Sequence, residues 1–560
     1  MKRNIFIFLI IFISLSVFDR NFWNTFFQQD EWNGFGTVIA LSHGSSIGWF
    51  GVLGSYHFVP FSQLLYFGLY KLFEYQAQYF AITSLILHAF ATLLVYTLYV
   101  KLTKKKFLSV ILSLFFAFNV NTSQAYLHLA IFPATVTCFI ATMIFFVYLE
   151  KISSSPRFTI KNVFILLALF FLSVGLREDG LLIILLFPLW SVLFAKKFLK
   201  KENRLSLGLF GGIIAAFFLF RFALQIFTPH VISLTKDSYW VTFLINLVWF
   251  APKIFAQTFI DGNSLLMFVW NFAQKFVGFQ IDLNTALKIL LPSAFIVIDV
   301  LLAGILIAGY RLSKKTERKL IIFGVGWAVA YSILLSAIGR QMDILESRYL
   351  YFPSFGVLLA VVTASSVLIQ KLLQKQKKFK QYIVAGCVLL IIFFLFFSYK
   401  GIRSTIDTGV IQGNARKSIL SSLQKLYPTI PKKAVIYVRC KTVCYRNAQF
   451  GIPNTVVLPF SSGPGYIFLL QYARRNETAY ARFFRKQKNG IEFLWDYGAE
   501  GYKEMNGYGF GYFIHEDLLR SNVVKYHIPL SDVIGLEYNE NTFTFTDISS
   551  QVRKEISQTN

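Results

Sequence analysis

Residues 382–399 read YIVAGCVLLIIFFLFFSY, eighteen consecutive residues without a charged side chain. Lys380 precedes this stretch and Lys400 follows it. An apolar run of this length, bounded by cations, is long enough to cross the hydrocarbon core of a bilayer as a single helix. The stretch therefore predicts a transmembrane helix, and it raises the question of how many others the chain contains.

The composition of the whole chain agrees with a membrane protein. Of the 560 residues, 55% are hydrophobic and 15% are charged, and the mean hydropathy is +0.55. These values exclude an array of soluble domains, and an aromatic content of 18% excludes a disordered, collagen-like or coiled-coil chain. The predicted fold class is an α-helical polytopic membrane protein.

Ten further apolar stretches have the composition expected of helices in a membrane. Together with the first they give about eleven predicted spans, at residues 4–19, 78–100, 107–120, 131–149, 162–176, 180–195, 206–228, 287–310, 320–338, 350–370 and 382–399. The first span follows Lys2 and Arg3 as a signal peptide would, but no small-residue cleavage site follows it. We therefore expect it to remain as an uncleaved anchor.

Lysine and arginine are distributed unequally between alternate connections. One set holds 24 of them, at 2–3, 101–106, 151–161, 196–204, 311–319 and 371–380; the other holds seven, at 19–59, 119–130, 177–179, 229–286 and 339–349. Cytoplasmic loops carry the excess of basic residues, so the N-terminus is predicted to be cytoplasmic and the second set to lie outside. An odd number of spans then places the tail outside as well.

The net charge of +27 would suggest a nucleic-acid partner if the protein were soluble. Most of the excess lies in the basic connections, where it has a simpler explanation in the anionic headgroups of membrane lipids. No basic groove interleaved with aromatic residues stands out. We therefore predict membrane lipids, and no nucleic acid, as partners.

The composition changes after residue 400, which divides the chain into a membrane domain at 1–400, with outer loops at 19–59 and 229–286, and an extracytoplasmic α/β domain at 401–560. The tail predicts a helix at 418–427 and strands at 434–438, around Phe493, and at 512–514, 533–538 and 542–545. Cys440 and Cys444 lie in this domain, where a disulfide is chemically allowed if the local backbone permits it. Cys138 and Cys387 lie in predicted spans and are expected to be small hydrophobic residues.

Loop 229–286 contains two apolar stretches, at 240–250 and 265–276. We expect them to form short amphipathic helices in the membrane interface, with an ordinary packed loop as the alternative.

Acidic residues gather in the predicted outer loops, and two adjacent pairs stand out. Asp30 and Glu31 lie in the stretch QQDEWNG at 28–34, and Glu178 and Asp179 lie in LREDG at 176–180, between two spans. Paired carboxylates suit a general base that deprotonates a hydroxyl, or ligands for a hard divalent cation. The alternative is that they are solvated loop charges.

A third polar cluster, GRQMDILESRYLYFPS at 339–354, enters the tenth predicted span. Arg348 lies where loop meets membrane, and a guanidinium there can bind a phosphate through two hydrogen bonds. An interfacial anchor is the alternative. Arg221 and Asp299 lie inside predicted spans, and His57 and His88 are either ligands or hydrogen-bonded structural residues.

Taken together, four stretches resemble the polytopic GT-C glycosyltransferases, especially the branch of the protein O-mannosyltransferases and related bacterial enzymes. They are Asp30-Glu31, the segment from YHFVPF at 56–61 through YKLF at 70–73 to LILHA at 85–89, REDG at 177–180, and SRYLYFPS at 347–354. The resemblance covers roughly residues 1–400 and rests on the order of the motifs. Two features depart from it: REDG replaces the usual Lys-Glu, and loop 119–130 contains no acidic residue.

The resemblance implies an inverting transfer of a sugar from a polyprenyl-phosphate donor to a protein, lipid or glycan acceptor, outside a bacterial plasma membrane. It assigns Asp30 as general base with Glu31 in support, and Arg348 to the carrier phosphate, with Arg177 or Arg221. The substrate-binding residues it implies are His57, Arg177, Glu178, Asp179, Arg221, Arg348 and Tyr349. Glu178 and Asp179 have two alternative roles, as metal ligands or as ion-pair partners of Arg177. No metal site is assigned, and a requirement for a divalent cation is left as an open alternative.

Two alternatives belong to other functional classes. A transporter or flippase of lipid-linked glycans predicts internal repeats and charges spread through the spans, whereas the acids here gather in the outer loops. A non-catalytic membrane scaffold that presents the tail is the second alternative.

Overall fold

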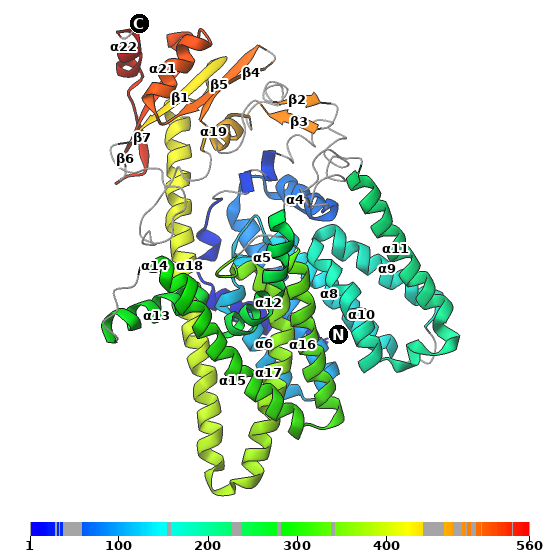
Figure 1. Cartoon of the computed structure of the whole chain (residues 1–560). Coiled ribbons are helices and arrows are strands. Elements are labelled where there is room, and N and C mark those ends of the chain that lie inside the picture. The colour runs from blue at the N-terminus through cyan, green and yellow to red at the C-terminus, as the bar shows by residue number, and fades with distance from the viewer. Residues whose placement is uncertain are drawn as a thin grey trace. The chain divides into compact units, whose positions relative to one another are not determined.

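The computed structural model describes residues 2–27, 31–32, 34–36, 59–153, 158–226, 237–276, 282–337, 342–440, 464–473, 484–487, 490–493, 500–505, 507–539 and 541–558. Helices dominate the chain as far as residue 426, and a small sheet with flanking helices follows (Figure 1).

The helices of the first part are α1 (Lys2–Phe18), α4 (Pro60–Phe73), α5 (Ala77–Thr103), α6 (Lys106–Ala117), α7 (Gln124–Leu127), α8 (Phe132–Ser153), α9 (Ile160–Leu176), α10 (Leu182–Leu193), α11 (Arg204–Ile226), α12 (Asp237–Phe259), α13 (Gly262–Phe276), α14 (Leu283–Thr285), α15 (Leu291–Leu312), α16 (Lys315–Ser336), α17 (Ser347–Lys375) and α18 (Lys380–Leu426). Short 3₁₀ turns include η1 (Phe22–Asn24), η3 (Val120–Thr122) and η4 (Glu178–Leu181), and a π-helical turn, η7 (Ala286–Leu290), precedes α15.

Within the described residues, seven helices are long and apolar enough to cross a membrane. They run over Ala77–Thr103, Phe132–Ser153, Tyr239–Phe259, Leu283–Leu312, Lys315–Ser336, Ser347–Lys375 and Lys380–Leu426, and four shorter apolar helices accompany them. Helices occupy all eleven of the stretches predicted as spans. The fold class of a helical membrane protein is therefore confirmed, while the number of spans stays a prediction.

The segment around Trp240 differs from its expected form. Instead of a short interfacial helix at 240–250, α12 is one continuous helix of 23 residues that passes through Pro252. A proline inside a helix normally ends it, but neighbouring helices can accommodate the lost hydrogen bond. The second expected helix, at 265–276, lies within α13.

The chain forms two compact units. The first comprises Met1–Arg20, Tyr56–Ser62 and Thr83–Arg403, and the second comprises Asn21–Ser55, Gln63–Ile82 and Ser404–Asn560. The second unit thus includes two N-terminal segments in addition to the tail, because the described parts of these segments pack with residues of α18 beyond position 403.

In the first unit, α16 and α17 run side by side with their backbones in close approach (Figure 1). A Cβ atom at Gly356 would lie 2.6 Å from the carbonyl oxygen of Gly324 and 2.6 Å from the Cβ of Trp327. The Trp327 indole also donates a hydrogen bond to the carbonyl of Phe352, at 2.9 Å. Small residues at such a crossing let two membrane helices approach closely, so the glycines fix the register of this pair.

The second unit contains a five-stranded sheet in the order β4-β5-β1-β6-β7. The strands are β1 (Lys433–Arg439), β4 (Gly501–Met505), β5 (Tyr508–Phe513), β6 (Val533–Asn539) and β7 (Thr544–Asp547); β2 (Phe484–Gln487) and β3 (Gly490–Phe493) form a separate hairpin. The central strand β1 is parallel to β5 and β6, and two antiparallel pairs complete the edges. A small C-terminal sheet is thus confirmed.

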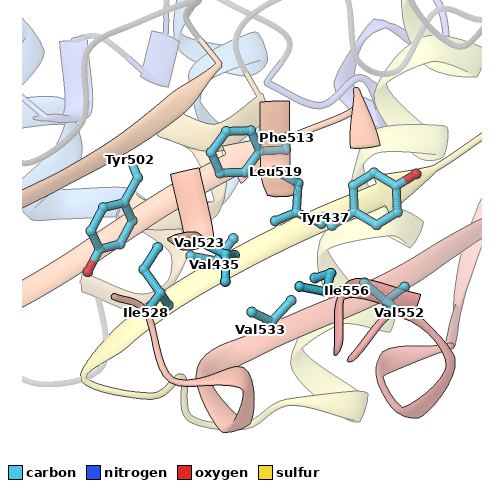
Figure 2. Close-up of a cluster of buried hydrophobic side chains, with 10 residues drawn as sticks. All are labelled: Val435, Tyr437, Tyr502, Phe513, Leu519, Val523, Ile528, Val533, Val552 and Ile556. Atoms are coloured by element: carbon cyan, nitrogen blue, oxygen red, sulfur yellow. The ribbon is translucent and has the colours of Figure 1, made fainter. Parts of the chain in front are cut away.

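Helices cover both faces of this sheet. On one face, α21 (Glu516–Lys525) and α22 (Ser549–Ser557) bury Leu519, Val523, Val552 and Ile556 against alternate strand residues (Figure 2). On the other face, Phe468 of α19 (Pro464–Ala473) packs on Tyr512 at a centroid distance of 5.8 Å. Because both faces of the sheet are covered, the five central residues of β1 are all buried and apolar. This uninterrupted apolar run is the pattern from which the strand was predicted.

The strands predicted at 434–438 and 533–538 coincide with β1 and β6. The one predicted at 542–545 begins two residues before β7, and β5 begins four residues before the predicted 512–514. Gly509 and Gly511 lower the strand propensity before Tyr512, which explains why the predicted strand began too late. Cys440, directly after β1, is disulfide-bonded; Cys444, its predicted partner, lies outside the described residues.

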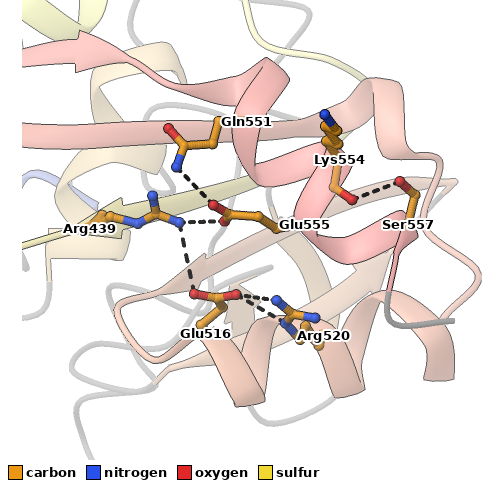
Figure 3. Close-up of polar contacts among 7 residues, drawn as sticks. All are labelled: Arg439, Glu516, Arg520, Gln551, Lys554, Glu555 and Ser557. Atoms are coloured by element: carbon orange, nitrogen blue, oxygen red, sulfur yellow. Dashed lines mark hydrogen bonds and ion pairs between the residues drawn. The ribbon is translucent and has the colours of Figure 1, made fainter.

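A network of ion pairs closes the carboxyl end of β1 (Figure 3). Arg439 contacts Glu555 of α22 at 2.5 Å and Glu516 of α21 at 3.8 Å. Gln551 donates a further hydrogen bond to Glu555, at 2.8 Å. The network therefore joins the last residue of the central strand to both helices of one face.

We predict that Gly356→Ala destabilises the first unit, because the added methyl group would overlap backbone and side-chain atoms across the α16–α17 contact. Overpacking of this kind costs about 1–3 kcal/mol, measurable as a lower midpoint of thermal unfolding in nanodiscs. Gly304→Ala on α15 is the matched control, because a Cβ there meets no described atom within 4 Å. Equal midpoints for the two variants would contradict the close packing.

We also predict that the sheet loses stability in acid. The hydrogen bond from Gln551, assisted by Arg439 and opposed by burial, lowers the pKa of Glu555, and the hydrogen bond from Lys433 lowers the pKa of Glu504. A lowered folded-state pKa stabilises the fold above the usual glutamate pKa of about 4.3, and this stabilisation is lost as the pH falls through the folded-state value. Thermal unfolding between pH 3 and 6 should show the decline.

Arg439→Gln should flatten the decline, because it removes the cation that favours ionised Glu555. Lys554→Gln is the matched control, since it removes the same charge from an exposed position on the same helix as Glu555. If Arg439→Gln retained the full pH dependence, the network would not be its source.

Candidate functional site

The stretch Arg-Glu-Asp-Gly forms the junction between α9 and α10 in the first unit. Helix α9 ends at Leu176, Arg177 is extended with φ −166° and ψ 152°, and Glu178 begins the turn η4. The extended residue redirects the chain, so that Arg177 and Asp179 lie close enough to interact. The acidic pair is therefore held on a tight turn between two apolar helices, as the sequence predicted.

Arg177 and Asp179 form an ion pair, with the guanidinium Nε 2.8 Å from the carboxylate Oδ2. The side chains are only 17% and 15% exposed. Tyr331 of α16 donates a hydrogen bond to Asp179 Oδ1 at 3.1 Å, and Arg177 Nη1 donates one to the hydroxyl of Thr135 on α8. Three segments of the chain, the α9–α10 junction, α8 and α16, therefore meet at this ion pair.

Burial alone would lower the pKa of Arg177, because it disfavours the charged form. Asp179, Tyr331 and the other neighbouring groups together outweigh burial and hold the pKa of the guanidinium above its ordinary value. Arg177 thus stays cationic in a largely enclosed position, and the ion pair supplies the partner that a buried charge requires.

Arg348 lies in the first turn of α17, next to the same cluster. Its Nη2 is 2.6 Å from Glu346 Oε2, the residue directly before the helix. The start of α17 is held against α7, because the hydroxyl of Ser347 accepts a hydrogen bond from the backbone N–H of Gln124 at 3.1 Å. The buried Nε of Arg348 meets no acceptor among the described residues.

Tyr349 connects the two arginines. The guanidinium of Arg177 lies 5.9 Å from the centroid of its ring, and that of Arg348 lies 5.1 Å from it. Both distances are those of cation–π contacts, which hold a cation over an aromatic face. The cluster therefore places two cations around one uncharged ring at the positive end of a 29-residue helix.

The structure places the predicted site residues as follows. Arg177, Asp179, Arg348 and Tyr349 come together in the first unit, and Glu178 lies in the same turn as Asp179. Asp30 and His57 lie outside the described residues, and Arg221 lies in α11, where only the backbone is described. The ion pair with Arg177, one of the roles left open for Asp179, is formed.

Glu31 belongs to the second unit and is 2% exposed. Its carbonyl accepts a hydrogen bond from Tyr66 at 3.2 Å. Its neighbour Trp32 stacks on Tyr75, with centroids 5.5 Å apart, and packs on Phe35 at 5.8 Å. Trp32, the residue after Glu31, therefore belongs to an aromatic core.

The sequence left two roles open for His88, as a ligand or as a hydrogen-bonded structural residue, and the structure shows the second. Its Nε2 lies 3.0 Å from the carbonyl of Ala117 and its Nδ1 lies 2.8 Å from the hydroxyl of Tyr351. Both ring nitrogens thus have partners within the protein. As to metals, no group of three or more His, Cys, Asp and Glu side chains that could hold an ion occurs in the described part of the chain.

Sequence reasoning missed Tyr331, Thr135 and Gln124, which position the cluster. Tyr331 lies in the middle of an apolar span, and the other two carry no motif. Their contacts to Asp179, Arg177 and α17 depend on how distant helices pack. One signal was available in the sequence. Ser332 and Ser336 lie four residues apart in α16, a spacing that predicts a polar helix face directed toward neighbouring helices.

Comparison of the chain with models of known protein families and with curated proteins found no match.

We predict that Asp179→Asn destabilises the first unit by about 3 kcal/mol, because it leaves the largely buried charge of Arg177 without its ion pair. Thermal unfolding of the purified full-length protein in nanodiscs measures the effect. Glu178→Gln is the matched control: it removes an acid one residue away and keeps the Arg177–Asp179 pair. An equal loss for both variants would show that net charge, and not this pair, is responsible.

Proposed function

We propose that this protein is a membrane glycosyltransferase that moves a sugar from a polyprenyl-phosphate donor to an acceptor hydroxyl. The observation that carries the proposal is the cluster of Arg177 and Arg348 around Tyr349. It concentrates two cations beside apolar helices, which suits a ligand that combines a phosphate with a lipid chain.

The chemistry of the proposed reaction needs such a cluster. The acceptor oxygen attacks the anomeric carbon, the bond from that carbon to the phosphate oxygen breaks, and the acceptor proton passes to a carboxylate. The departing polyprenyl phosphate gains negative charge, so it is stabilised by cations rather than by protonation. Attack from the opposite side inverts the configuration at the anomeric carbon.

Arg348 is the residue that we assign to the phosphate. One of its terminal nitrogens pairs with Glu346, whereas its buried Nε has no acceptor among the described residues. A bound phosphate oxygen would satisfy such a donor. The first turn of α17 adds its positive dipole end at the same place. Arg177 contributes longer-range charge, because Asp179 already occupies its Nε.

Asp30 is the proposed general base, with Glu31 in support; this part of the proposal comes from the sequence resemblance. We further propose that the N-terminus is cytoplasmic and that the C-terminal domain lies outside a bacterial plasma membrane. The disulfide at Cys440 supports that orientation, because disulfides persist in oxidising compartments.

The test is sugar transfer by the full-length protein in nanodiscs, with a panel of polyprenyl-phosphate monosaccharides and with polyprenyl phosphate release as the readout. Arg348→Gln should lower kcat by about 100-fold or more, because it removes stabilisation of the leaving group. Asp30→Asn should lower it by about 100-fold or more, because it removes the proton acceptor.

Arg318→Gln is the matched control for Arg348. Arg318 also lies over a tyrosine ring, 5.3 Å from the centroid of Tyr310, but it is exposed and belongs to a predicted cytoplasmic connection. Transfer that survives Arg348→Gln and Asp30→Asn unchanged would refute the assigned roles. Failure of every donor, together with movement of a lipid-linked glycan across liposomes, would favour a flippase instead.

A further inference from the structure

The second unit contains a cavity of about 680 Å³. All of its described lining residues belong to that unit. They come from five separate stretches: the segment around η1, Trp32, the turn between α4 and α5, the part of α18 from Val410 onwards, and α19. The volume falls within the range of about 300–1,000 Å³ that is usual for small-molecule sites.

Aromatic rings form one part of the wall. Trp23 is 37% exposed, so its ring is accessible to a ligand. Trp32 and Tyr75, which also line the cavity, stack on each other and are buried, with exposed fractions of 0% and 7%. Phe26 packs on Trp32 at a centroid distance of 6.3 Å. The cavity therefore has a rigid aromatic support and one accessible indole.

Side-chain amides form most of the polar wall. Six of the sixteen described lining residues are asparagine or glutamine: Asn24, Gln76, Gln78, Asn414, Gln424 and Gln471. Thr25 and Ser421 add hydroxyl groups. An amide side chain both donates and accepts hydrogen bonds, as a sugar hydroxyl does. This wall is thus matched to a ligand with many hydroxyl groups.

The charges in the cavity exclude other ligand classes. Lys417 is the one charged residue among the described lining residues, and none of them carries a carboxylate. A divalent cation would require carboxylate ligands, and a nucleic acid or a polyphosphate would require several cations. A lipid chain would require an apolar rim, whereas Gln76, Gln78 and Asn414 are exposed at this one.

We infer that this cavity binds a saccharide, with an aromatic ring against the C–H face of a sugar and the amides on its hydroxyl groups. Apolar C–H faces of sugars pack on aromatic rings, which supply a large contact area at little entropic cost. The inference also deepens the proposed function. If the protein is a glycosyltransferase, a saccharide site identifies its acceptor as a glycan, and this part of the inference rests on the proposed function.

The test measures binding directly, without sugar transfer. The full-length protein is placed in phospholipid nanodiscs free of maltoside and glucoside detergents, because their headgroups are themselves sugars. Saturation-transfer NMR and equilibrium dialysis are carried out with maltotriose, cellotriose, mannotriose and chitotriose, and with inorganic phosphate and a serine- and threonine-containing peptide. At least one trisaccharide should bind saturably, and phosphate and the peptide should not compete with it.

Two variants locate the binding. Trp23→Ala should weaken it by about tenfold or more. The double variant Gln76→Ala/Gln78→Ala should do the same, and because both residues are exposed it should keep the thermal unfolding midpoint of the wild type. Trp240→Ala is the matched control, since this tryptophan of the first unit is 58% exposed and does not line the cavity.

The outcomes separate this inference from the proposed function. Saccharide binding that is lost in the variants, in a protein that transfers no sugar, would support the cavity and refute the transferase. Sugar transfer that the cavity variants do not affect, with no trisaccharide binding, would support the transferase and refute the saccharide site. Binding of phosphate or of the peptide alone, with no trisaccharide bound, would overturn the inference.

Discussion

The close backbone contact between α16 and α17 is the constraint on which the rest of the first unit depends. Where Gly324 and Gly356 meet, no side chain separates the helices, so their relative register has little freedom. Tyr331, two turns further along α16, then stacks on Phe352 and reaches Asp179. The start of α17, with Arg348 and Tyr349, is carried on the same rigid pair. The polar cluster is thus positioned by an apolar contact that contains none of its residues.

The cluster also shows how this unit accommodates charge. Arg177 is largely enclosed; it pairs with Asp179 and donates a hydrogen bond to Thr135, and Tyr331 donates one to Asp179. Arg348 is more accessible and keeps a buried donor that no described residue accepts from. One arginine therefore serves mainly to build the site and the other has capacity for a ligand. Each arginine has its own carboxylate partner, Asp179 for Arg177 and Glu346 for Arg348, and the ring of Tyr349 contacts both guanidinium groups.

Features that depend on residues close together in the sequence could be predicted from it, whereas features that depend on packing between distant segments could not. The helices at the predicted spans and the strands β1 and β6 were predictable, because continuous hydrophobicity depends only on neighbouring residues. Helix α12 was underestimated because Pro252 and Lys253 interrupt its apolar run. The sequence identified Arg177, Asp179, Arg348 and Tyr349 separately, but their meeting depends on packing between helices that are distant along the chain. The cavity was missed for the same reason, since its amides are ordinary residues until separate stretches bring them together.

The sheet of the second unit is organised around β1, and the disulfide at Cys440 follows that strand directly, one residue after the ion-pair network of Arg439. The central strand is therefore secured at its carboxyl end by both covalent and ionic bonds. This has a practical consequence for preparing the protein. A chain synthesised in a cell-free mixture that contains dithiothreitol would carry this sheet without its covalent restraint, so the expression route determines which form of the C-terminal domain is obtained.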